Sequence, residues 1–277
     1  MEADIKVAIA LPVYKNDNES YLRMSVESII NQTYNNCHLF IGVDGPVFGG
    51  LSDFLDSLRQ ERNVSIIYFE ENRGLACVLN DLLDICFSDG YEYVARMDAD
   101  DISELNRIEK QLFFLIEHPE IDVVGGAISE IDEAGRSRKK TIIYPETPDA
   151  CKAFFSKRNP HAHPAVLFRK SFFDKLAGNK YRPEYRQNQD TMLWYDGMMK
   201  GTQHANIPDV VLHFRITDSL FKKRRNGWFF AKKQLADRIK INHGLGYGWK
   251  ADLYGFAMFC MLVSPVWVKK IAYRFFR

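Results

Sequence analysis

The sequence lacks the features that mark secreted, membrane-spanning or disordered chains. Its 277 residues include only five Cys, with no CxxC spacing and no even framework, which argues against disulfides or a zinc cluster. No apolar run reaches the roughly 18–20 residues that cross a bilayer. The polar opening and the short apolar run at residues 7–13 do not resemble a secretory signal. These absences favour reduced thiols in the cytosol.

Apolar residues are plentiful, and charge is unevenly distributed. Hydrophobic residues make up 46% of the chain and aromatic residues 13%, which is enough for a sizeable core. The formal net charge is only +1, yet residues 220–277 carry thirteen Lys and Arg against two Asp. The same segment holds thirteen of the 37 aromatic residues. We therefore predict a catalytic domain over residues 1–219 and a basic, aromatic, amphipathic tail over residues 220–277.

The first hundred residues alternate between two kinds of pattern. Apolar runs typical of buried strands cover residues 7–13, 38–43, 64–69 and 93–97. Helical spacing of apolar residues covers residues 19–31, 51–58 and 75–87. This alternation predicts βαβ units and a mainly parallel sheet flanked by helices, with ligands at the carboxyl ends of the strands.

The pattern loosens after residue 101. We predict helices at residues 107–118 and 189–200, a hairpin-like stretch at 133–140, and strands at 123–131, 163–168 and 210–216. Residues 1–101 are expected to form a nucleotide-binding half, and residues 102–219 an acceptor half.

An acidic cluster follows the fourth predicted strand. Asp98, Asp100 and Asp101 place three carboxylates within four residues, and their mutual repulsion has to be offset. Mg²⁺ and Mn²⁺ accept one or two carboxylates together with substrate phosphates, so the cluster predicts a metal–diphosphate site. The alternative is a solvated turn in which Asp101 or Ser103 caps the next helix.

Six motifs of this chain resemble those of glycosyltransferase family 2, the inverting transferases of GT-A type. The resemblance covers residues 5–216 and is nearest to the bacterial branch that builds exopolysaccharide and O-antigen repeat units, such as the amylovoran-type transferases. In order, the motifs are Leu11-Pro12-Val13-Tyr14-Lys15, Val43-Asp44-Gly45-Pro46, Glu71-Asn72-Arg73-Gly74-Leu75-Ala76, Ala95-Arg96-Met97-Asp98-Ala99-Asp100-Asp101, Arg158-Asn159-Pro160 with His163, and Gln189-Asp190 before Leu193-Trp194.

The resemblance implies a GT-A fold and a set of residues that bind a UDP-sugar. Pro12 and Tyr14 would pack on the base, and Asp44 would hydrogen-bond the uracil. Asn72 and Arg73 would lie near the base and the phosphates. In the acidic motif, Asp98 would face the ribose, Ala99 would line the nucleotide-sugar site, and Asp100 together with Asp98 would bind Mn²⁺ or Mg²⁺. Asp190 would be the catalytic base.

The chemistry of sugar transfer explains why such residue types are needed. The departing diphosphate needs positive charge already in place, which Asp100 would supply through its metal and Arg73 directly. An attacking hydroxyl needs a base, worth roughly 10²–10⁴-fold, and Asp190 begins a predicted helix facing the cleft. The sequence departs from the family at Gln189, where Glu is usual, and that change concerns only the surroundings of the base.

Two further residues are candidates for the acceptor or the diphosphate, namely His163 and Arg215. The spacing of His161 and His163 would also allow a metal, although one packed and one exposed His is the commoner outcome for such a pair. Neither residue has a defined role from its pattern alone.

The tail predicts attachment to a membrane surface. Its apolar run at residues 253–268 reaches only about 24 Å as a helix and contains Pro265, so it suits a helix lying in the interface. Trp249, Trp267 and Phe275 would lie at headgroup depth, and residues 222–225 would face anionic lipid. This placement, peripheral on the cytoplasmic face of the bacterial inner membrane, agrees with a polyprenyl-diphosphate-linked saccharide acceptor. Packing of the tail on the body or in a dimer is the alternative, and we expect no nucleic-acid binding.

Two other function classes remain open. A sugar nucleotidyltransferase would share the early βαβ pattern, but it typically carries a glycine-rich basic loop after the first strand, and residues 14–18 contain no glycine. A non-catalytic module that binds nucleotide-sugars or a membrane surface would not depend on Asp190.

Overall fold

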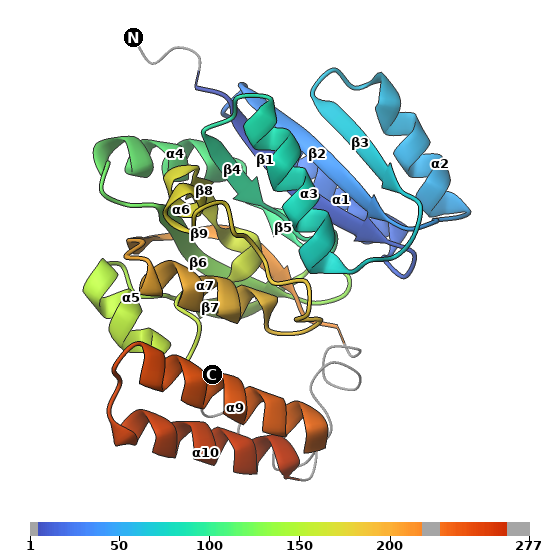
Figure 1. Ribbon diagram of the computed structural model, residues 1–277. Helices are drawn as coiled ribbons and strands as arrows, with labels where there is room; N and C mark the ends of the chain where they lie inside the picture. The colour runs from blue at the N-terminus through green and yellow to red at the C-terminus, as the bar shows by residue number, and fades with distance from the viewer. Residues whose placement is uncertain (1–4, 218–227, 265–277) are drawn as a thin grey trace.

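The computed structural model describes residues 5–217 and 228–264 of the chain (Figure 1). The nucleotide-binding half follows the predicted alternation. Its strands are β1 (Val7–Tyr14), β2 (Cys37–Asp44), β3 (Val64–Phe69) and β4 (Tyr93–Arg96). Its helices are α1 (Glu19–Ile30), α2 (Gly50–Ser57) with the 3-10 turn η1 (Leu58–Gln60), and α3 (Leu75–Ser88).

The second half adds short and long strands between helices. The strands are β5 (Ile102–Ser103), β6 (Val123–Ile131), β7 (Ser137–Ile142), β8 (Leu167–Arg169) and β9 (His204–Arg215). The helices are α4 (Arg107–Glu117), α5 (Pro148–Phe155), the 3-10 turn η2 (His163–Ala165), α6 (Ser171–Lys175) and α7 (Gln189–Met199).

The nine strands of the described residues belong to one mixed, mostly parallel sheet in the order β3-β2-β1-β4-β8-β6-β9-β5, with β7 beside β6. The longest ladders, β1 with β2 and β6 with β9, are parallel, whereas β8 runs antiparallel to both of its neighbours. The predicted architecture of a mainly parallel sheet flanked by helices is therefore confirmed. A single sheet joins the two halves, so the boundary near residue 101 is not a break in the fold.

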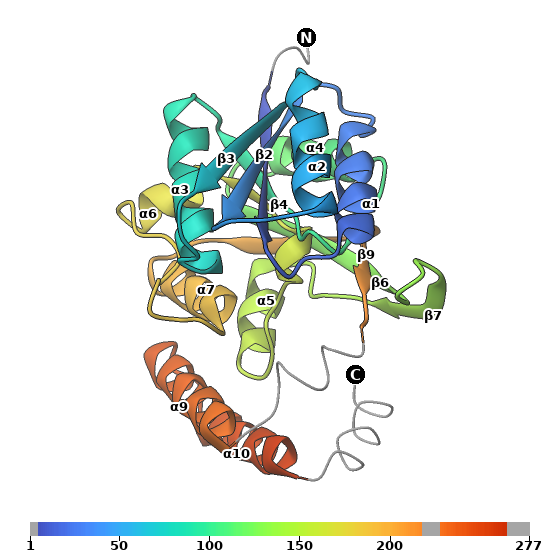
Figure 2. The same ribbon diagram turned by 90° about the vertical axis from the view of Figure 1, so that its right-hand side faces the viewer.

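Helices cover both faces of the sheet, as Figure 2 shows nearly edge-on. Alternate residues of β1 point to opposite faces. Val7, Ile9 and Leu11 pack with α1, α2 and α4. Ala8 and Ala10 pack with α3, α6 and α7 on the other face. Because β1 is buried on both faces, its sequence is a continuous apolar run.

Three local predictions differ from the structure. Residues 163–168 were expected as one strand, but residues 163–165 form the turn η2 and the strand begins only at Leu167. Pro164 lacks the N–H that a ladder needs, which explains the late start. β9 begins at His204, six residues before the predicted start, and the helices α5 and α6 were not predicted.

The described part of the tail is a helical hairpin of α9 (Trp228–Gly244) and α10 (Trp249–Val263). The two helices lie side by side next to α5 and α7 in both views (Figures 1 and 2). Ala251 and Gly255 of α10 are buried, and Gly255 lies against Leu235 and Arg238 of α9. Within residues 5–217 and 228–264, no helix is long and apolar enough to cross a membrane. Residues 222–225, Trp267 and Phe275 lie outside the described residues.

Candidate active site

The carboxyl ends of the parallel strands bring the predicted donor residues together. Tyr14 and Asp44 are paired in the register of β1 and β2, and Phe69 of β3 is the next partner of Asp44. Pro12 lies two residues before Tyr14 on β1, opposite Gly42 of β2. The strand-end rule for open parallel sheets thus locates this side of the site.

Asp44 is the buried centre of a small hydrogen-bonded loop. Its carboxylate accepts N–H groups from the backbone of Arg73 at 2.8 Å and of Gly74 at 2.9 Å. The side chain of Asn72 donates to the same carboxylate at 2.9 Å. Gly74 has a φ of 93°, which suits glycine and directs these N–H groups back toward Asp44. Asp44 therefore holds the shape of residues 72–74.

Arg73 and Arg186 place positive charge around this loop. The Arg73 guanidinium pairs with Asp81 of α3 and lies 4.7 Å from the centre of the Phe69 ring. A Cβ built on Gly74 would lie 2.7 Å from Arg186 Nη1, so the Arg186 side chain packs directly on the loop. Residues 182–189, called the base loop below because they lead to the predicted base Asp190, thus reach the loop that Asp44 holds. The strand ends at Pro12, Tyr14 and Asp44, together with residues 72–74, are called the donor side below.

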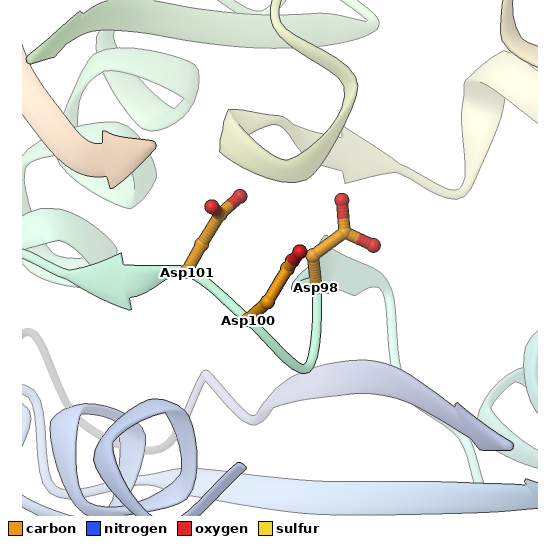
Figure 3. Close-up of side chains that lie close together, drawn as sticks. All are labelled: Asp98, Asp100 and Asp101. Atoms are coloured by element: carbon orange, nitrogen blue, oxygen red, sulfur yellow. The ribbon is translucent and has the colours of Figure 1, made fainter. Parts of the chain in front are cut away.

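The acidic cluster gathers three carboxylates after β4. Figure 3 shows Asp98, Asp100 and Asp101 on one turn, with their carboxyl groups on the same side of the chain. One oxygen of each lies within 4.8 Å of the others. Burial, followed by the charges of Asp100 and Asp98, raises the pKa of Asp101, and its buried Oδ2 has no hydrogen-bond partner. An all-oxygen donor set with an orphaned buried oxygen fits a hard divalent cation.

Arg96 links this cluster to Asp190. The guanidinium is buried, and its Nη2 lies 2.5 Å from Asp98 Oδ1. Its charge also lowers the pKa of Asp190, against the larger raising effect of desolvation. The Arg96 guanidinium thus pairs with Asp98 and also favours the ionised form of Asp190.

Asp190 lies in the first turn of α7 and is held by a neighbouring segment. Asn159 Nδ2 donates to Asp190 Oδ2 at 3.0 Å, and Asn159 also contacts the Thr191 hydroxyl. Desolvation raises the pKa of Asp190 above its ordinary value. A carboxylate with a raised pKa is a stronger base while it remains ionised at neutral pH.

Buried histidine and tyrosine side chains lie next to the candidate site. His163 Nε2 lies 2.7 Å from the hydroxyl of Tyr181. Burial raises the pKa of Tyr181, and the charges of Asp190 and Asp98 both add to that rise. Burial also lowers the pKa of His163 well below its usual range, so the ring is neutral. His161 is buried as well, contrary to the expectation of one packed and one exposed ring.

Arg215, at the end of β9, lies behind the acidic turn. Its Nε donates to the backbone oxygen of Asp100 at 2.7 Å, and its Nη1 donates to the backbone oxygens of Asp132 and Glu133. Its backbone N–H donates to Asp101 Oδ1 at 2.8 Å. This placement fits a role in holding the acidic turn, and direct contact with a diphosphate stays a prediction.

Sequence reasoning gave no role to Arg96, Asn159 or Tyr181. A signal existed for Arg96, because a charged residue inside a buried apolar strand needs a partner, and its partner Asp98 is two residues away. Asn159 stood in a quoted motif, but its contact with Asp190 spans 31 positions and depends on the fold. Ala99, between the two predicted metal ligands, is buried and has only a methyl group, which leaves the turn free of bulk.

Comparisons with known proteins show which proteins the chain is similar to in sequence and in fold. A sequence model of the family "Glycosyl transferase family 2" matches residues 8–176. The chain is 32% identical over 228 residues to the amylovoran biosynthesis glycosyltransferase AmsE of Erwinia amylovora, covering 82% of each. It is 28% identical to the UDP-Gal:alpha-D-GlcNAc-diphosphoundecaprenol beta-1,3-galactosyltransferase of Escherichia coli, over 79% of this chain and 77% of that one. The S. aureus TarS 1-349 structure in complex with UDP-GlcNAc superposes with a TM-score of 0.65 at 13% identity, covering 96% of this chain and 83% of that one.

Proposed function

Because the chain belongs to glycosyltransferase family 2, we propose that it moves a sugar from a UDP-sugar to a lipid-diphosphate-linked saccharide, with inversion, in bacterial surface polysaccharide synthesis. One observation carries the proposal: Arg96 pairs with Asp98 of the acidic cluster and also acts on Asp190. Arg186, four residues before Asp190, packs on Gly74 of the loop that Asp44 holds, and together these observations support one site in which a single sugar contacts both the donor side and the base.

The names of similar proteins support the choice of substrates. The E. coli relative uses UDP-Gal and a GlcNAc-diphosphoundecaprenol acceptor by its name. TarS has been crystallised with UDP and with UDP-GlcNAc. AmsE takes part in amylovoran biosynthesis, and another relative in O-antigen biosynthesis. A UDP-sugar and a lipid-linked acceptor are thus the first substrates to test.

In this proposal the donor side binds the nucleotide through residues at the strand ends. Pro12 and Tyr14 pack against the base, and Asp44 contacts the uracil while it holds Asn72 and Arg73 in place. Each Asp44 oxygen has two lone pairs, so the N–H bonds within the loop leave acceptor capacity for a ligand. Asp98 faces the ribose, and Ala99 leaves room beside it.

Asp100 and Asp98 would hold Mn²⁺ or Mg²⁺, with Asp101 completing the acidic set. The chemistry supplied by such a bound cation is neutralisation of charge on the diphosphate. Arg215 keeps the turn that carries Asp100 in position by binding its backbone oxygen. Arg73 adds a further positive charge on the donor side.

The step assigned to Asp190 is removal of the acceptor proton. Asp190 takes the hydroxyl proton as the acceptor oxygen bonds to the anomeric carbon. The bond from that carbon to the diphosphate oxygen breaks, and its electron pair leaves with UDP. A single displacement with one base inverts the anomeric centre, whereas a retaining double displacement uses two carboxyl groups about 5 Å apart on either side of the sugar.

The division of the chain follows from these roles. Residues 1–101 form the nucleotide-binding half of the catalytic domain 1–219, and residues 102–219 form the acceptor half, where His163 supports the acceptor side through Tyr181. Residues 220–277 form the attachment segment. We place the protein on the cytoplasmic face of the inner membrane, where lipid-linked acceptors would be accessible.

The outer face of α10 supports membrane attachment. Trp249, Leu253, Phe256 and Val263 are 71%, 59%, 54% and 40% exposed, respectively. Together with exposed Cys260, they recur at spacings of three and four and therefore form one stripe. Exposed lysines accompany the stripe on the hairpin, at positions 232, 233, 240 and 250. An apolar stripe with basic neighbours fits an anionic lipid surface.

Vesicle sedimentation tests this attachment. We expect the full chain to sediment with vesicles containing phosphatidylglycerol. Trp249→Ser combined with Phe256→Ser should reduce binding at least roughly tenfold, since each removes exposed apolar area that would be buried in the lipid. Ile143→Ser is the control, because it removes an exposed apolar side chain from a segment outside the hairpin. Equal sedimentation of the double variant and the control would contradict attachment through α10.

The transferase activity itself is tested by UDP release. The assay combines a panel of UDP-sugars with GlcNAc-diphosphoundecaprenol and either Mn²⁺ or Mg²⁺, and mass spectrometry identifies the product. We expect acceptor-dependent UDP release that a chelator abolishes. Release of diphosphate from a nucleoside triphosphate and sugar phosphate would instead indicate a nucleotidyltransferase, and no turnover with any donor would favour a binding module.

A further inference from the structure

The C-terminal hairpin contacts both segments that flank Asp190. The base loop enters α7 through Asn188, two residues before Asp190, and Asn159 holds the Asp190 carboxylate from the other side. Each of these flanks is hydrogen-bonded to a different helix of the hairpin. These contacts span 49 and 96 positions of the sequence.

On the first flank, Asn188 is held in an uncommon conformation by α9. Its φ of 62° and ψ of 19° are left-handed, a region that Asn tolerates better than most residues. Asn usually caps a helix with its own side chain, but here that side chain makes no capping bond to α7. Instead its Nδ2 donates to Asp237 Oδ2 at 3.1 Å, and its Oδ1 accepts from Gln234.

Asp237 is well placed to fix the whole base loop. It is only 7% exposed, and its second oxygen accepts from the Tyr185 hydroxyl at 3.3 Å. Lys233, one turn earlier on α9, lies 4.3 Å from the centre of the Tyr185 ring. A buried carboxylate that is shared between two residues of one loop restricts that loop more than either contact alone.

On the second flank, α10 holds the segment that carries Asn159. Arg158 Nε donates to the Tyr254 hydroxyl at 3.2 Å. The next residue, Asn159, donates to Asp190. α9 also reaches the preceding helix, because Arg238 donates to the backbone oxygen of Phe155.

From these contacts we propose that Asp237 is a positioning residue: through Asn188 it sets the place of Asp190, so that the attachment hairpin is also a structural part of the catalytic site. This inference rests on the proposed role of Asp190 as the base. It adds that the tail is needed for the chemical step itself, in addition to any contact with a membrane. A shift of about 1 Å in a catalytic group can cost 10²-fold in rate.

The test compares Asp237→Ala with a matched control, Asp252→Ala, in the full chain. Asp252 binds Asn242 and His243 within the hairpin and makes no contact with the base loop among the described hydrogen bonds. We expect Asp237→Ala to lower kcat 10–100-fold, with the KM for the UDP-sugar and the affinity for UDP within about twofold of the parent. Asp252→Ala is expected to keep the parental kcat. The assay is UDP release from the most active UDP-sugar with GlcNAc-diphosphoundecaprenol, in detergent so that membrane attachment plays no part.

A double-mutant cycle identifies the route of the effect. If Asp237 acts through Asn188, then Asn188→Gly, which keeps the left-handed conformation but removes the side chain, lowers kcat and adds little to Asp237→Ala. Additive losses, an unchanged kcat in Asp237→Ala, or an equal loss in Asp252→Ala would each overturn the inference. Because Asp190→Asn tests the base directly, an inactive Asp190→Asn beside a normal Asp237→Ala rejects only the inference, whereas an active Asp190→Asn rejects the proposed function.

Discussion

The two sides of the site are built in different ways. On the donor side, Asp44 at the end of β2 binds residues only 28 to 30 positions later. Those residues follow β3, the parallel neighbour of β2. On the base side, Asp190 and its loop are held by Asn159 and Asp237, which come from segments outside the βαβ repeat. The donor side is therefore a product of the sheet topology, and the base side is a product of individual long-range side-chain contacts.

Replacing the proposed base Asp190 is expected to have the largest effect. We expect Asp190→Asn to lower kcat by roughly 10²–10⁴-fold, because the amide cannot accept the acceptor proton. The donor side is untouched, so UDP affinity measured by calorimetry should stay at the parental value. Asp174→Asn, an exposed carboxylate paired with Lys170, is the control for a loss of one negative charge. A variant that keeps more than a tenth of the parental kcat would show that another group removes the proton.

A substitution on the donor side should change KM for the UDP-sugar and not kcat. Asp44→Ala leaves the N–H groups of Arg73 and Gly74 and the Asn72 amide without their shared acceptor. A hydrogen bond to a charged group is worth about 1.5–3 kcal/mol, so we expect KM for the UDP-sugar to rise roughly 10–100-fold.

For Asp44→Ala, kcat at saturating donor should change little, since Asp190 and its contacts remain. Thermal unfolding serves as the check that the sheet is intact. A fall in kcat as large as that of Asp190→Asn, with KM unchanged, would mean that the two sides are not separable in the way the hydrogen bonds suggest.

The same contrast explains what could be predicted from sequence. Apolar runs and the turns behind them located β1 to β4, and the strand-end rule then placed Tyr14, Asp44 and the acidic cluster together. Asp190 was predicted from the family motif and not from its surroundings. Its support by Asn159 and Asp237 could not be predicted, because no local pattern encodes which distant residue meets a loop. α5 and α6 were missed for a related reason: they are short, and their apolar residues are too few to show a period.

The free energy of unfolding should fall in acid because of buried histidines in the second half of the catalytic domain. His161, His163 and His204 are buried in the second half, where burial lowers the pKa of each, that of His161 to about 4. The unfolded chain binds these protons near pH 6.5 and the folded chain does not, so the free energy of unfolding is full above about pH 6.5 and falls as the pH drops from there toward 4.

A single substitution measures one share of this acid sensitivity. His161→Asn removes one titrating ring and should lower the slope of unfolding free energy against pH by up to about 1.4 kcal/mol per pH unit. Urea unfolding between about pH 6.5 and 4.5 gives the slope. His118→Gln, which removes a half-exposed ring, is the control for the loss of an imidazole. If both variants keep the parental slope, the buried rings are not the source of acid instability.

The smallest expected effect concerns the pH profile of the base. Asn159 donates to the ionised form of Asp190, which favours that form, so Asn159→Ala should raise the pKa of Asp190 further above its ordinary value. The base must be ionised to act. The acidic limb of the kcat–pH profile should therefore move to higher pH, while kcat on the plateau above that limb changes only a few-fold because Asp190 is ionised there. Asp44→Ala should leave this limb in place, since Asp44 belongs to the donor side. A limb that moves in Asp44→Ala but stays fixed in Asn159→Ala would reverse the assignment of the two sides.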